Sequence, residues 1–374
     1  MSNSDTRYER YARQLSLKEF GEAGQERLLQ SSVIIVGAGG LGCAILPYLA
    51  AAGVGRIGII DDDVIKLHNL HRQVLYTVND IGFSKAKQAA AALKKINPEI
   101  SIEAFKERLL PVNALSLLNN FDLIIDGTDN FASRYMINDA CVLLNKPFVY
   151  GAVSKFEGQV AVFNYRQEGV PSVNYRDLFP QPPQPGSVDN CEEAGVLGVL
   201  PGIIGTMMAN EAIKLLAGIG QPLVNRLLTY NAFNNQMLEL ELQAQQGTRQ
   251  LIPENETVFA QTDYEWLCGT NTLVNEIDAE TFDRLKGNDK VLVADVRELG
   301  ELPLVTEFAH VQSPLSKLTT DFPLADNIET IILFCQSGKR SRQAAQVLTD
   351  KFGDNKKIYS LANGIVSWKQ SHKN

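Results

Sequence analysis

The sequence has little of what would mark a secreted, membrane-spanning or nucleic-acid-binding protein. Its five cysteines are scattered and form no C-x-x-C pair, which argues against a disulfide framework and against a thiolate zinc site. The net charge of −8 is opposite in sign to the basic face of a general nucleic-acid binder. Residues 1–13 are polar and charged, with no apolar signal segment. We therefore expect a cytoplasmic enzyme that binds neither nucleic acid nor membrane.

Long uninterrupted hydrophobic runs are also missing. The most apolar segment, 195–217, contains Pro201, Asn210, Glu211 and Lys214, whereas a bilayer-spanning helix needs about 20 nearly uninterrupted apolar residues. This segment therefore predicts a buried helix packed on a sheet. The 374 residues, 45% hydrophobic and 21% charged, have the composition of a globular protein and the length of two domains.

A glycine-rich turn follows the first predicted strand. The β-branched run 33–36 indicates a strand buried on both faces, and Gly37, Gly39 and Gly42 follow with the G-x-G-x-x-G spacing of a nucleotide-binding turn. Glycines there allow a tight turn and close approach of a phosphate to a helix N-terminus, which favours an anion. Asp61, about twenty residues further on, ends the next strand and is placed to bind ribose hydroxyls. The motif predicts a nucleotide site without specifying the nucleotide.

Strand and helix patterns alternate over residues 1–245, which is typical of an α/β fold with parallel strands. The predicted strands are 33–36, 56–61, 101–105, 122–126, 147–153, 158–164, 227–232 and 237–242. The predicted helices are 41–52, 85–96 and 195–217, with a helical lead-in over 7–29.

Two stretches interrupt this pattern. Residues 165–195 are proline-rich and aperiodic, which favours a functional lid or crossover loop. Residues 243–256 are polar and aperiodic, and we predict an interdomain linker over 246–271. The α/β pattern then restarts with strands 291–295, 330–334 and 357–361 and a helix 341–352. We therefore expect two domains, 1–245 and 272–374.

Charged and polar side chains gather near the predicted strand ends of the first domain. Arg72 and Lys85 are two cations that could offset the charge that builds on a triphosphate during attack at phosphorus. Asp129 could hold Mg²⁺, which prefers one or two carboxylates together with phosphate oxygens. Each of these alone could be a solvated loop residue, but together with Asn69 and Gln73 they favour an ATP site. A hydride-transfer enzyme needs no such set, because the phosphates of its cofactor only anchor it.

Five short motifs follow one another along the first domain. They are Arg10-Tyr11-Ala12-Arg13-Gln14, Gly37-Ala38-Gly39-Gly40-Leu41-Gly42, Asn69-Leu70-His71-Arg72-Gln73, Gly82-Phe83-Ser84-Lys85 and Asp126-Gly127-Thr128-Asp129-Asn130. In kind and order they resemble the MoeB/ThiF/HesA family, bacterial relatives of ubiquitin-activating enzymes, over about residues 7–242. The resemblance implies a Rossmann-like, mostly parallel sheet with added antiparallel strands. It also implies adenylation, with Mg·ATP, of the C-terminal Gly-Gly of a small ubiquitin-like sulfur carrier for molybdopterin or thiamine synthesis.

The resemblance also assigns roles to individual residues. Those that would bind ATP are Gly37, Gly39, Gly40, Gly42, Asp61, Asn69, Arg72, Gln73, Lys85 and Asp129. Asp61 would hold the ribose, and Asp129 would hold Mg²⁺. Arg13 would reach the ATP of the other subunit, which implies a homodimer.

The long loop 165–195 bears on two further predictions, a catalytic role for Cys191 and the absence of a structural zinc site. Cys191 precedes a predicted helix, whose dipole favours a thiolate although the neighbouring glutamates oppose it. A free cysteine is usually a small buried hydrophobe, but the resemblance implies a covalent link between this cysteine and the carrier or its sulfur. The family commonly holds zinc with two C-x-x-C pairs, and here Asn174-Tyr175-Arg176-Asp177 replaces the first pair while 243–250 contains no cysteine. Structural zinc needs four thiolate or imidazole ligands, so we predict none.

The second domain contains a cysteine loop, Cys335-Gln336-Ser337-Gly338-Lys339-Arg340-Ser341, between a strand and a helix. Such a loop can direct its N–H groups at the sulfur, while Arg340 and the helix dipole stabilise an anion. With Asp295-Val296-Arg297-Glu298 and Asn363-Gly364-Ile365-Val366-Ser367-Trp368, it resembles a rhodanese-like sulfurtransferase over about 272–373. The resemblance implies a smaller α/β domain in which Cys335 carries a persulfide supplied by a donor such as a cysteine desulfurase. The stretch 299–313 is shortened against that family.

The two domains together predict one reaction sequence. An acyl-adenylate is an electrophile and a persulfide is a nucleophile, so adenylation of a carrier followed by sulfur transfer would give a thiocarboxylate. The alternative is an NAD(P)-dependent oxidoreductase with a regulatory rhodanese-like module, which leaves Arg13, Arg72, Lys85 and Asp129 unexplained. A non-catalytic binding protein with relic domains is a third hypothesis, and the intact ATP-site residues and Cys335 count against it.

Overall fold

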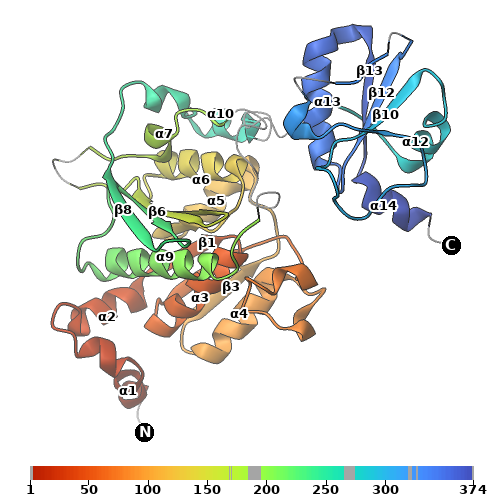
Figure 1. The fold of residues 1–374 in the computed structure, drawn as a ribbon. Helices are drawn as coiled ribbons and strands as arrows, with labels where there is room; N and C mark the ends of the chain where they lie inside the picture. Colours follow the sequence, from red (N-terminus) through yellow and green to blue (C-terminus); the bar gives the residue numbers. More distant parts are fainter. Residues whose placement is uncertain are drawn as a thin grey trace. The chain divides into compact units, whose positions relative to one another are not determined.

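The computed structural model describes residues 3–167, 169, 171–183, 195–264, 274–318, 322–325 and 327–372. These residues form two compact units. The first takes the described residues up to Pro182 and from Gly195 to Tyr264, and the second takes those from Val274 on. Each unit is a sheet with helices on both faces (Figure 1). Within the described ranges, no helix is long and apolar enough to cross a membrane.

The first unit is built on an eight-stranded sheet in the order β3-β2-β1-β4-β5-β6-β7-β8. Strands β3 to β5 in this order are parallel, and β6, β7 and β8 extend the sheet with antiparallel pairing. The bounds are β1 Ser32–Val36, β2 Arg56–Ile60, β3 Ser101–Phe105, β4 Leu123–Asp126, β5 Phe148–Ser154, β6 Glu157–Phe163, β7 Arg226–Asn231 and β8 Gln236–Glu241.

The order of these strands creates a crevice at their carboxyl ends. From β1 the chain moves outward through β2 to β3, and it then returns to the other side of β1 as β4. The register aligns Val36 with Ile60 on one side and with Asp126 on the other, so the three strands end level. The position between β1 and β4, where the strand order reverses direction, is called a topological switch point. An open α/β sheet binds its ligands there, outside the carboxyl ends of the strands.

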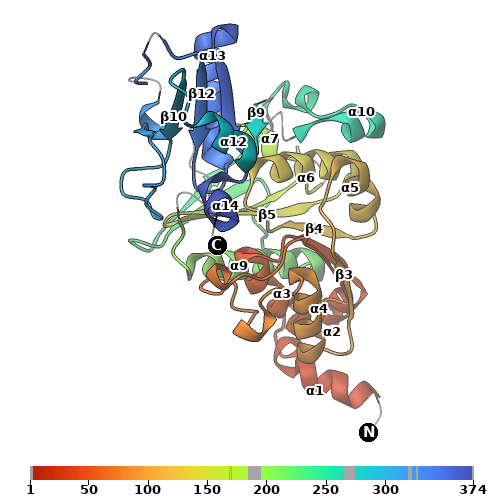
Figure 2. The same cartoon turned by 90° about the vertical axis from the view of Figure 1, so that its right-hand side faces the viewer.

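Helices cover both faces of this sheet. Helices α5 and α6 lie on one face and α3, α4 and α9 on the other (Figure 1, Figure 2). The bounds are α1 Asn3–Leu15, α2 Gly21–Gln30, α3 Gly40–Ala52, α4 Lys85–Ile96, α5 Pro111–Leu118, α6 Phe131–Leu144, α7 Tyr175–Leu178, α9 Leu200–Ala217 and α10 Glu256–Gln261. Helix α9, the most apolar segment of the sequence, is buried along Leu200, Ile204 and Met208 against the sheet. Burial of this face against the sheet accounts for the apolar composition of the segment.

The second unit is a parallel five-stranded sheet in the order β11-β10-β12-β13-β9. Side chains of β12 alternate between two apolar cores. Ile331 and Leu333 pack with α13, whereas Ile332 and Phe334 pack with Phe282 of α12 and the α14 side chains. The bounds are β9 Asn275–Ile277, β10 Val291–Asp295, β11 Val311–Gln312, β12 Thr330–Phe334, β13 Lys357–Leu361, α12 Ala279–Leu285, α13 Lys339–Phe352 and α14 Gly364–Ser371.

The fold class predicted from the sequence is confirmed, and the predicted strands of the first unit agree with β1 to β8 to within one residue at each end. The segment 246–271, expected to be a linker, differs. Part of it folds as a 3₁₀ turn, Thr248–Leu251, and as α10, with Phe259 and Tyr264 buried in the first unit. Its few apolar residues follow neither a helical nor a strand period, so the sequence pattern did not show that they are buried.

Candidate active site

The glycine turn between β1 and α3 is packed so closely that side chains cannot enter it. Gly37 has φ +97°, and a Cβ there would lie 2.8 Å from the carbonyl oxygen of Gly127 at the end of β4. A Cβ on Gly42 would lie 2.3 Å from the carbonyl oxygen of Gly37. One on Gly40 would lie 2.9 Å from Pro201 Cβ. The turn therefore keeps the N-terminus of α3 at the crevice between β1 and β4, open to a phosphate.

Asp61, the residue after β2, is tied to this turn. Its Oδ2 accepts a hydrogen bond from the Ala38 N–H at 2.8 Å, and its Oδ1 accepts one from the Asp63 N–H at 2.8 Å. Burial raises the pKa of Asp61, against the opposing effects of the Ala38 hydrogen bond and the Lys85 charge. The carboxylate predicted to hold the ribose therefore lies beside the glycine turn.

Lys85 opens α4 and is almost completely buried. A cation is unfavourable at a helix N-terminus, and here its Nζ lies 2.7 Å from Asp63 Oδ2. Burial alone would raise the pKa of Asp63, but the hydrogen bond and charge of Lys85 outweigh it, and the pKa lies below its ordinary value. The anion beside Lys85 is therefore Asp63, a residue to which sequence reasoning gave no role in the site.

The loop between Asp61 and Lys85 contains three further predicted residues, and it brings two of them to the turn. Arg72 Cγ lies 3.6 Å from the Cβ position of Gly40, and Gln73 Nε2 lies 3.7 Å from that of Gly39. Asn69 is buried and shapes the loop, since its Oδ1 accepts a hydrogen bond from the Lys66 N–H at 3.1 Å. The structure thus brings Asp61, Arg72, Gln73 and Lys85 to the turn, with Asn69 buried in the loop that connects them.

Tyr76 is a second residue of this loop that sequence reasoning missed. Its hydroxyl donates to the Ala38 carbonyl at 2.9 Å and lies 3.2 Å from the Lys85 carbonyl. This side chain links the glycine turn to the start of α4. Spacing along the sequence gave no signal for it.

The end of β4 supplies the carboxylates. Asp126 is completely buried; its Oδ1 accepts hydrogen bonds from the Thr128 N–H at 2.9 Å and hydroxyl at 2.7 Å. Its Oδ2 has no hydrogen-bond partner among the described residues, nor has Gln73 Oε1. Burial raises the pKa of Asp126. Asp129, the residue predicted to hold Mg²⁺, is exposed at the start of the segment that leads into α6.

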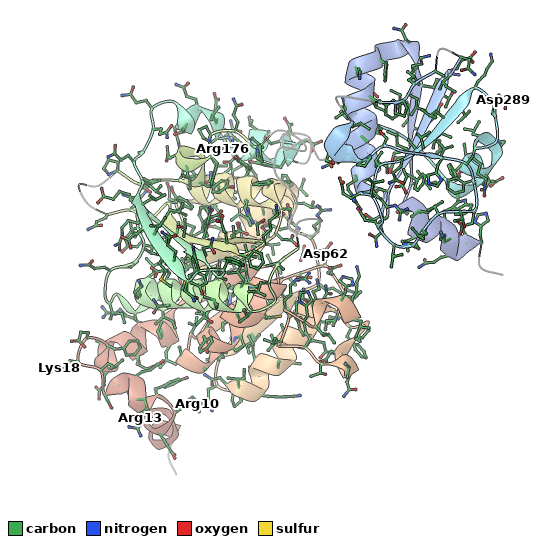
Figure 3. The ribbon with its side chains drawn as sticks, viewed as in Figure 1. Arg10, Arg13, Lys18, Asp62, Arg176 and Asp289 are labelled. Atoms are coloured by element: carbon green, nitrogen blue, oxygen red, sulfur yellow. The ribbon has the colours of Figure 1, made fainter. Side chains whose placement is uncertain are left out.

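Two predicted residues are not part of this cluster. Arg13 lies on α1 with its side chain exposed, well separated from Asp62, the neighbour of Asp61 (Figure 3). Within one chain Arg13 therefore does not reach the glycine turn. Cys191 lies outside the described residues.

The segment expected to take the place of a zinc-binding pair forms a buried polar cluster. Arg176, labelled in Figure 3, donates to both oxygens of Asp139 at 2.8 and 2.7 Å, and the Tyr264 hydroxyl donates to Asp139 at 2.9 Å. Asp177 accepts from the Gln245 N–H at 2.9 Å and from the Thr248 hydroxyl. These contacts join the segments that contain 174–177 and 245–248. Among the described residues, no group of three or more histidine, cysteine, aspartate or glutamate side chains could hold a metal ion.

Cys335 follows β12 and precedes α13, with 1% of its surface exposed. The Ser341 hydroxyl lies 3.6 Å from its Sγ. The loop is held by α14, because the Ile365 and Val366 N–H groups donate to the carbonyls of Cys335 and Gln336 at 2.8 and 3.2 Å. Arg340 forms a bidentate ion pair with Glu301, a residue that sequence reasoning missed.

These two sites define a nucleotide-binding α/β enzyme joined to a domain with a cysteine loop. The chain belongs to the ThiF family, which it matches over residues 11–250, and residues 278–371 match the rhodanese-like domain. Both halves of the resemblance drawn from the sequence are thereby confirmed.

Individual proteins are similar to this chain over most of its length. The probable adenylyltransferase/sulfurtransferase MoeZ of Mycobacterium tuberculosis is 40% identical over 96% of this chain and 92% of its own. The sulfur carrier protein adenylyltransferase of Thermus thermophilus is 48% identical over 70% of this chain and 96% of its own. The crystal structure of PaaA, 26% identical, matches 65% of this chain and 75% of its own with a TM-score of 0.54.

Proposed function

We propose that the protein adenylates the C-terminal glycine of a small sulfur-carrier protein with ATP and then transfers sulfur to it. The adenylation step rests on the arrangement of side chains at the glycine turn. Lys85 and Arg72 flank the N-terminus of α3, and carboxylates lie at the end of the neighbouring strand β4. The relatives named adenylyltransferase support this step, and the rhodanese-like domain supports the sulfur transfer. The protein is an adenylyltransferase with sulfurtransferase activity.

The residues at the turn suit attack of a carboxylate on the α-phosphorus of ATP. A new O–P bond forms to the carrier, and the bond to pyrophosphate breaks. The negative charge on the phosphate oxygens is stabilised by Arg72, Lys85 and the N-terminus of α3. The glycine turn excludes side chains, so these charges act at short range on the phosphates. Asp61, beside Ala38, is placed to accept hydrogen bonds from the ribose hydroxyls.

The residues at the end of β4 fit a magnesium ion bound with ATP. Asp129 would hold it, and the buried Oδ2 of Asp126, which has no hydrogen-bond partner among the described residues, is an acceptor at the same strand end. Oxygen ligands of this kind are those that Mg²⁺ prefers. When bound, the ion would neutralise phosphate charge.

We further propose that the protein acts as a homodimer. Arg13 is exposed on α1 and remote from the turn of its own chain, as expected of a side chain that serves the partner subunit's ATP. A symmetric dimer would supply one Arg13 to each site.

Sulfur would reach the carrier through Cys335. The terminal sulfur of a Cys335 persulfide attacks the carbonyl carbon of the acyl-adenylate, and AMP leaves with the C–O bond electrons. The resulting acyl disulfide is cleaved by a second thiol, for which Cys191 is this chain's candidate; the carrier leaves as a thiocarboxylate, and a disulfide between Cys191 and Cys335 forms. A dithiol reductant of the thioredoxin class then reduces this disulfide to two thiols. A cysteine desulfurase would renew the persulfide. Thiols of this kind stay reduced in the cytoplasm, where we place the reaction.

The adenylation half is tested by exchange of labelled pyrophosphate into ATP in the presence of carriers that end in Gly-Gly. Carriers of the molybdopterin and thiamine types would be compared. We expect exchange with the wild-type protein, and a loss of about 10²–10³-fold in Arg72→Ala because one charge-stabilising group is gone. Arg166→Ala, which removes an exposed arginine that contacts Asn145, serves as the control and should exchange normally. Equal exchange in all three proteins would overturn the assignment.

A further inference from the structure

A short segment of the second unit, 298–304, is joined to the cysteine loop by an ion pair. Arg340 Nη1 and Nη2 lie 2.6 and 2.8 Å from Glu301 Oε1 and Oε2. Two parallel N–H···O bonds of this kind are the geometry with which arginine binds planar oxyanions. The guanidinium on the Cys335 loop is therefore matched by a carboxylate of the protein itself.

The carboxylate of Glu301 is positioned by its own segment. Its Oε1 also accepts a hydrogen bond from the Glu298 N–H at 2.7 Å. Near the other end of the segment 298–304, the Pro303 carbonyl accepts a hydrogen bond from Arg297 Nη1 at 3.0 Å. Arg297 itself forms a buried ion pair with Asp295. The Arg340 hydrogen bonds lower the pKa of Glu301, so it is anionic at neutral pH. The contact is therefore more specific than a chance pairing of two long surface side chains.

Apolar packing contributes little to holding this segment. Leu299, Leu302 and Leu304 are 74%, 73% and 62% exposed. A segment with few buried apolar contacts opens at low free-energy cost. Polar contacts hold Glu301 in place, so an anion that competes for Arg340 can displace it.

The sulfur donors that would react with Cys335 carry a negative charge, as the Glu301 carboxylate does. Inorganic and protein-borne sulfane donors are anions, and Arg340, in the first turn of the helix that follows Cys335, is a cation with which such an anion can pair. We infer that Glu301 occupies the anion site of the sulfur donor at Arg340, and that a donor binds by displacing it. This inference rests on the proposed role of Cys335 in sulfur transfer.

Thiosulfate is a suitable probe because its transfer needs no further oxidant or reductant. The Cys335 thiolate attacks the outer sulfur, an S–S bond forms, and the bond to the sulfonate sulfur breaks, so that sulfite leaves with the electron pair. Cyanide then takes the outer sulfur of the persulfide to give thiocyanate, and the thiolate returns. Thiocyanate formation by the full-length protein therefore measures binding and transfer.

The test compares Glu301→Gln with the matched control Glu298→Gln. Both remove one negative charge from the same segment, but the Glu298 carboxylate accepts a hydrogen bond from the Ser316 hydroxyl at 2.7 Å instead of facing Arg340. In Glu301→Gln we expect the KM for thiosulfate to fall about tenfold, as for loss of one charge-assisted pair, with kcat within about twofold. Glu298→Gln should change both constants little. A purely structural role of Glu301 would not lower KM.

An unchanged or raised KM in Glu301→Gln, or an equal fall in both variants, would overturn the inference. Failure of the proposed sulfurtransferase role would look different from failure of this inference. In that case the wild-type protein would form no thiocyanate and no persulfide on Cys335. In that case calorimetric titration with thiosulfate still decides the question. Tighter binding to Glu301→Gln than to the wild type and to Glu298→Gln supports displacement, and equal binding contradicts it.

Discussion

At the scale of single residues, Lys85 is the buried cation that we propose acts on the phosphates of ATP. It is buried at the N-terminus of α4, a position that is unfavourable for a cation unless an anion lies nearby. Asp63 is that anion in this structure, at 2.7 Å. With ATP present, the phosphates supply further negative charge, so Lys85 is suited to stabilise charge that develops during attack at phosphorus.

Lys85→Ala therefore removes this stabilisation from the transition state. We expect kcat for carrier-dependent pyrophosphate exchange to fall about 10²–10³-fold. Lys87→Ala, an exposed lysine on the same helix, is the matched control and should leave exchange unchanged. Exchange in Lys85→Ala at the wild-type rate would show that Lys85 does not act on the phosphates.

The sequence predicted Lys85 but not its partner, and the reason lies in the backbone. The loop that separates them folds back on itself, with Ile65 N–H donating to Phe83 O and Lys85 N–H donating to Asp63 O at 2.9 and 3.1 Å. Such pairing has no periodic sequence signature. The Glu301–Arg340 pair was missed for the same reason, since 39 positions separate its members.

At the scale of elements, the turn from β1 into α3 was predictable because steric exclusion leaves a direct mark on the sequence. Gly42 can carry no side chain without displacing the Gly37 carbonyl. The polar cluster around Arg176 left no such mark. Its residues fall in a stretch that reads as a proline-rich loop, and their partners come from α6 and from the segment after β8.

Gly42→Ala tests the turn. A Cβ 2.3 Å from a backbone oxygen forces β1 and α3 apart, so we expect loss of ATP-dependent exchange and a lower melting temperature. Gly202→Ala is the control, because a Cβ on this residue of α9 meets nothing within 4 Å. That control should be as stable as the wild type or more stable by about 0.5–1 kcal/mol. Normal exchange in Gly42→Ala would contradict the packing described for the turn.

Asp139→Asn tests the polar cluster. The side chains of Arg176 and Asp139 are 4% and 0% exposed, so removing one charge leaves the other buried and unpaired. We expect the free energy of unfolding of the first unit to fall by about 3–5 kcal/mol, measured by urea denaturation with circular dichroism. Glu239→Gln breaks the more exposed pair with Arg226 and should cost less than about 1 kcal/mol. Similar losses in both variants would contradict the structural role of the cluster.

At the scale of the whole molecule, the chain joins an activating unit to a sulfur-carrying unit. The described part of the first unit extends to Tyr264, within the segment 246–271 that the sequence predicted as a linker, and the described part of the second begins at Val274. Composition identifies polar stretches but does not show that Phe259 and Tyr264 are buried within them. A tether raises the effective concentration of each unit near the other.

The proposed dimer makes a prediction at this scale. Arg13→Ala and Lys85→Ala should each be nearly inactive in exchange, since both residues would act on the same ATP from different subunits. After the two variants are mixed and allowed to exchange subunits, part of the activity should return, because each heterodimer contains one intact site. If mixing restores nothing although heterodimers form, Arg13 does not act across the interface.

The most direct test of the account is the mass of the carrier after incubation with the protein, ATP and a persulfide donor. The wild-type protein should replace one oxygen of the carrier's C-terminal carboxylate with sulfur. Cys335→Ser should stop at the adenylated carrier, and Arg72→Ala should leave the carrier unmodified. Thiocarboxylate formation by Cys335→Ser, or its absence with the wild-type protein and every Gly-Gly carrier, would contradict the coupling of the two units.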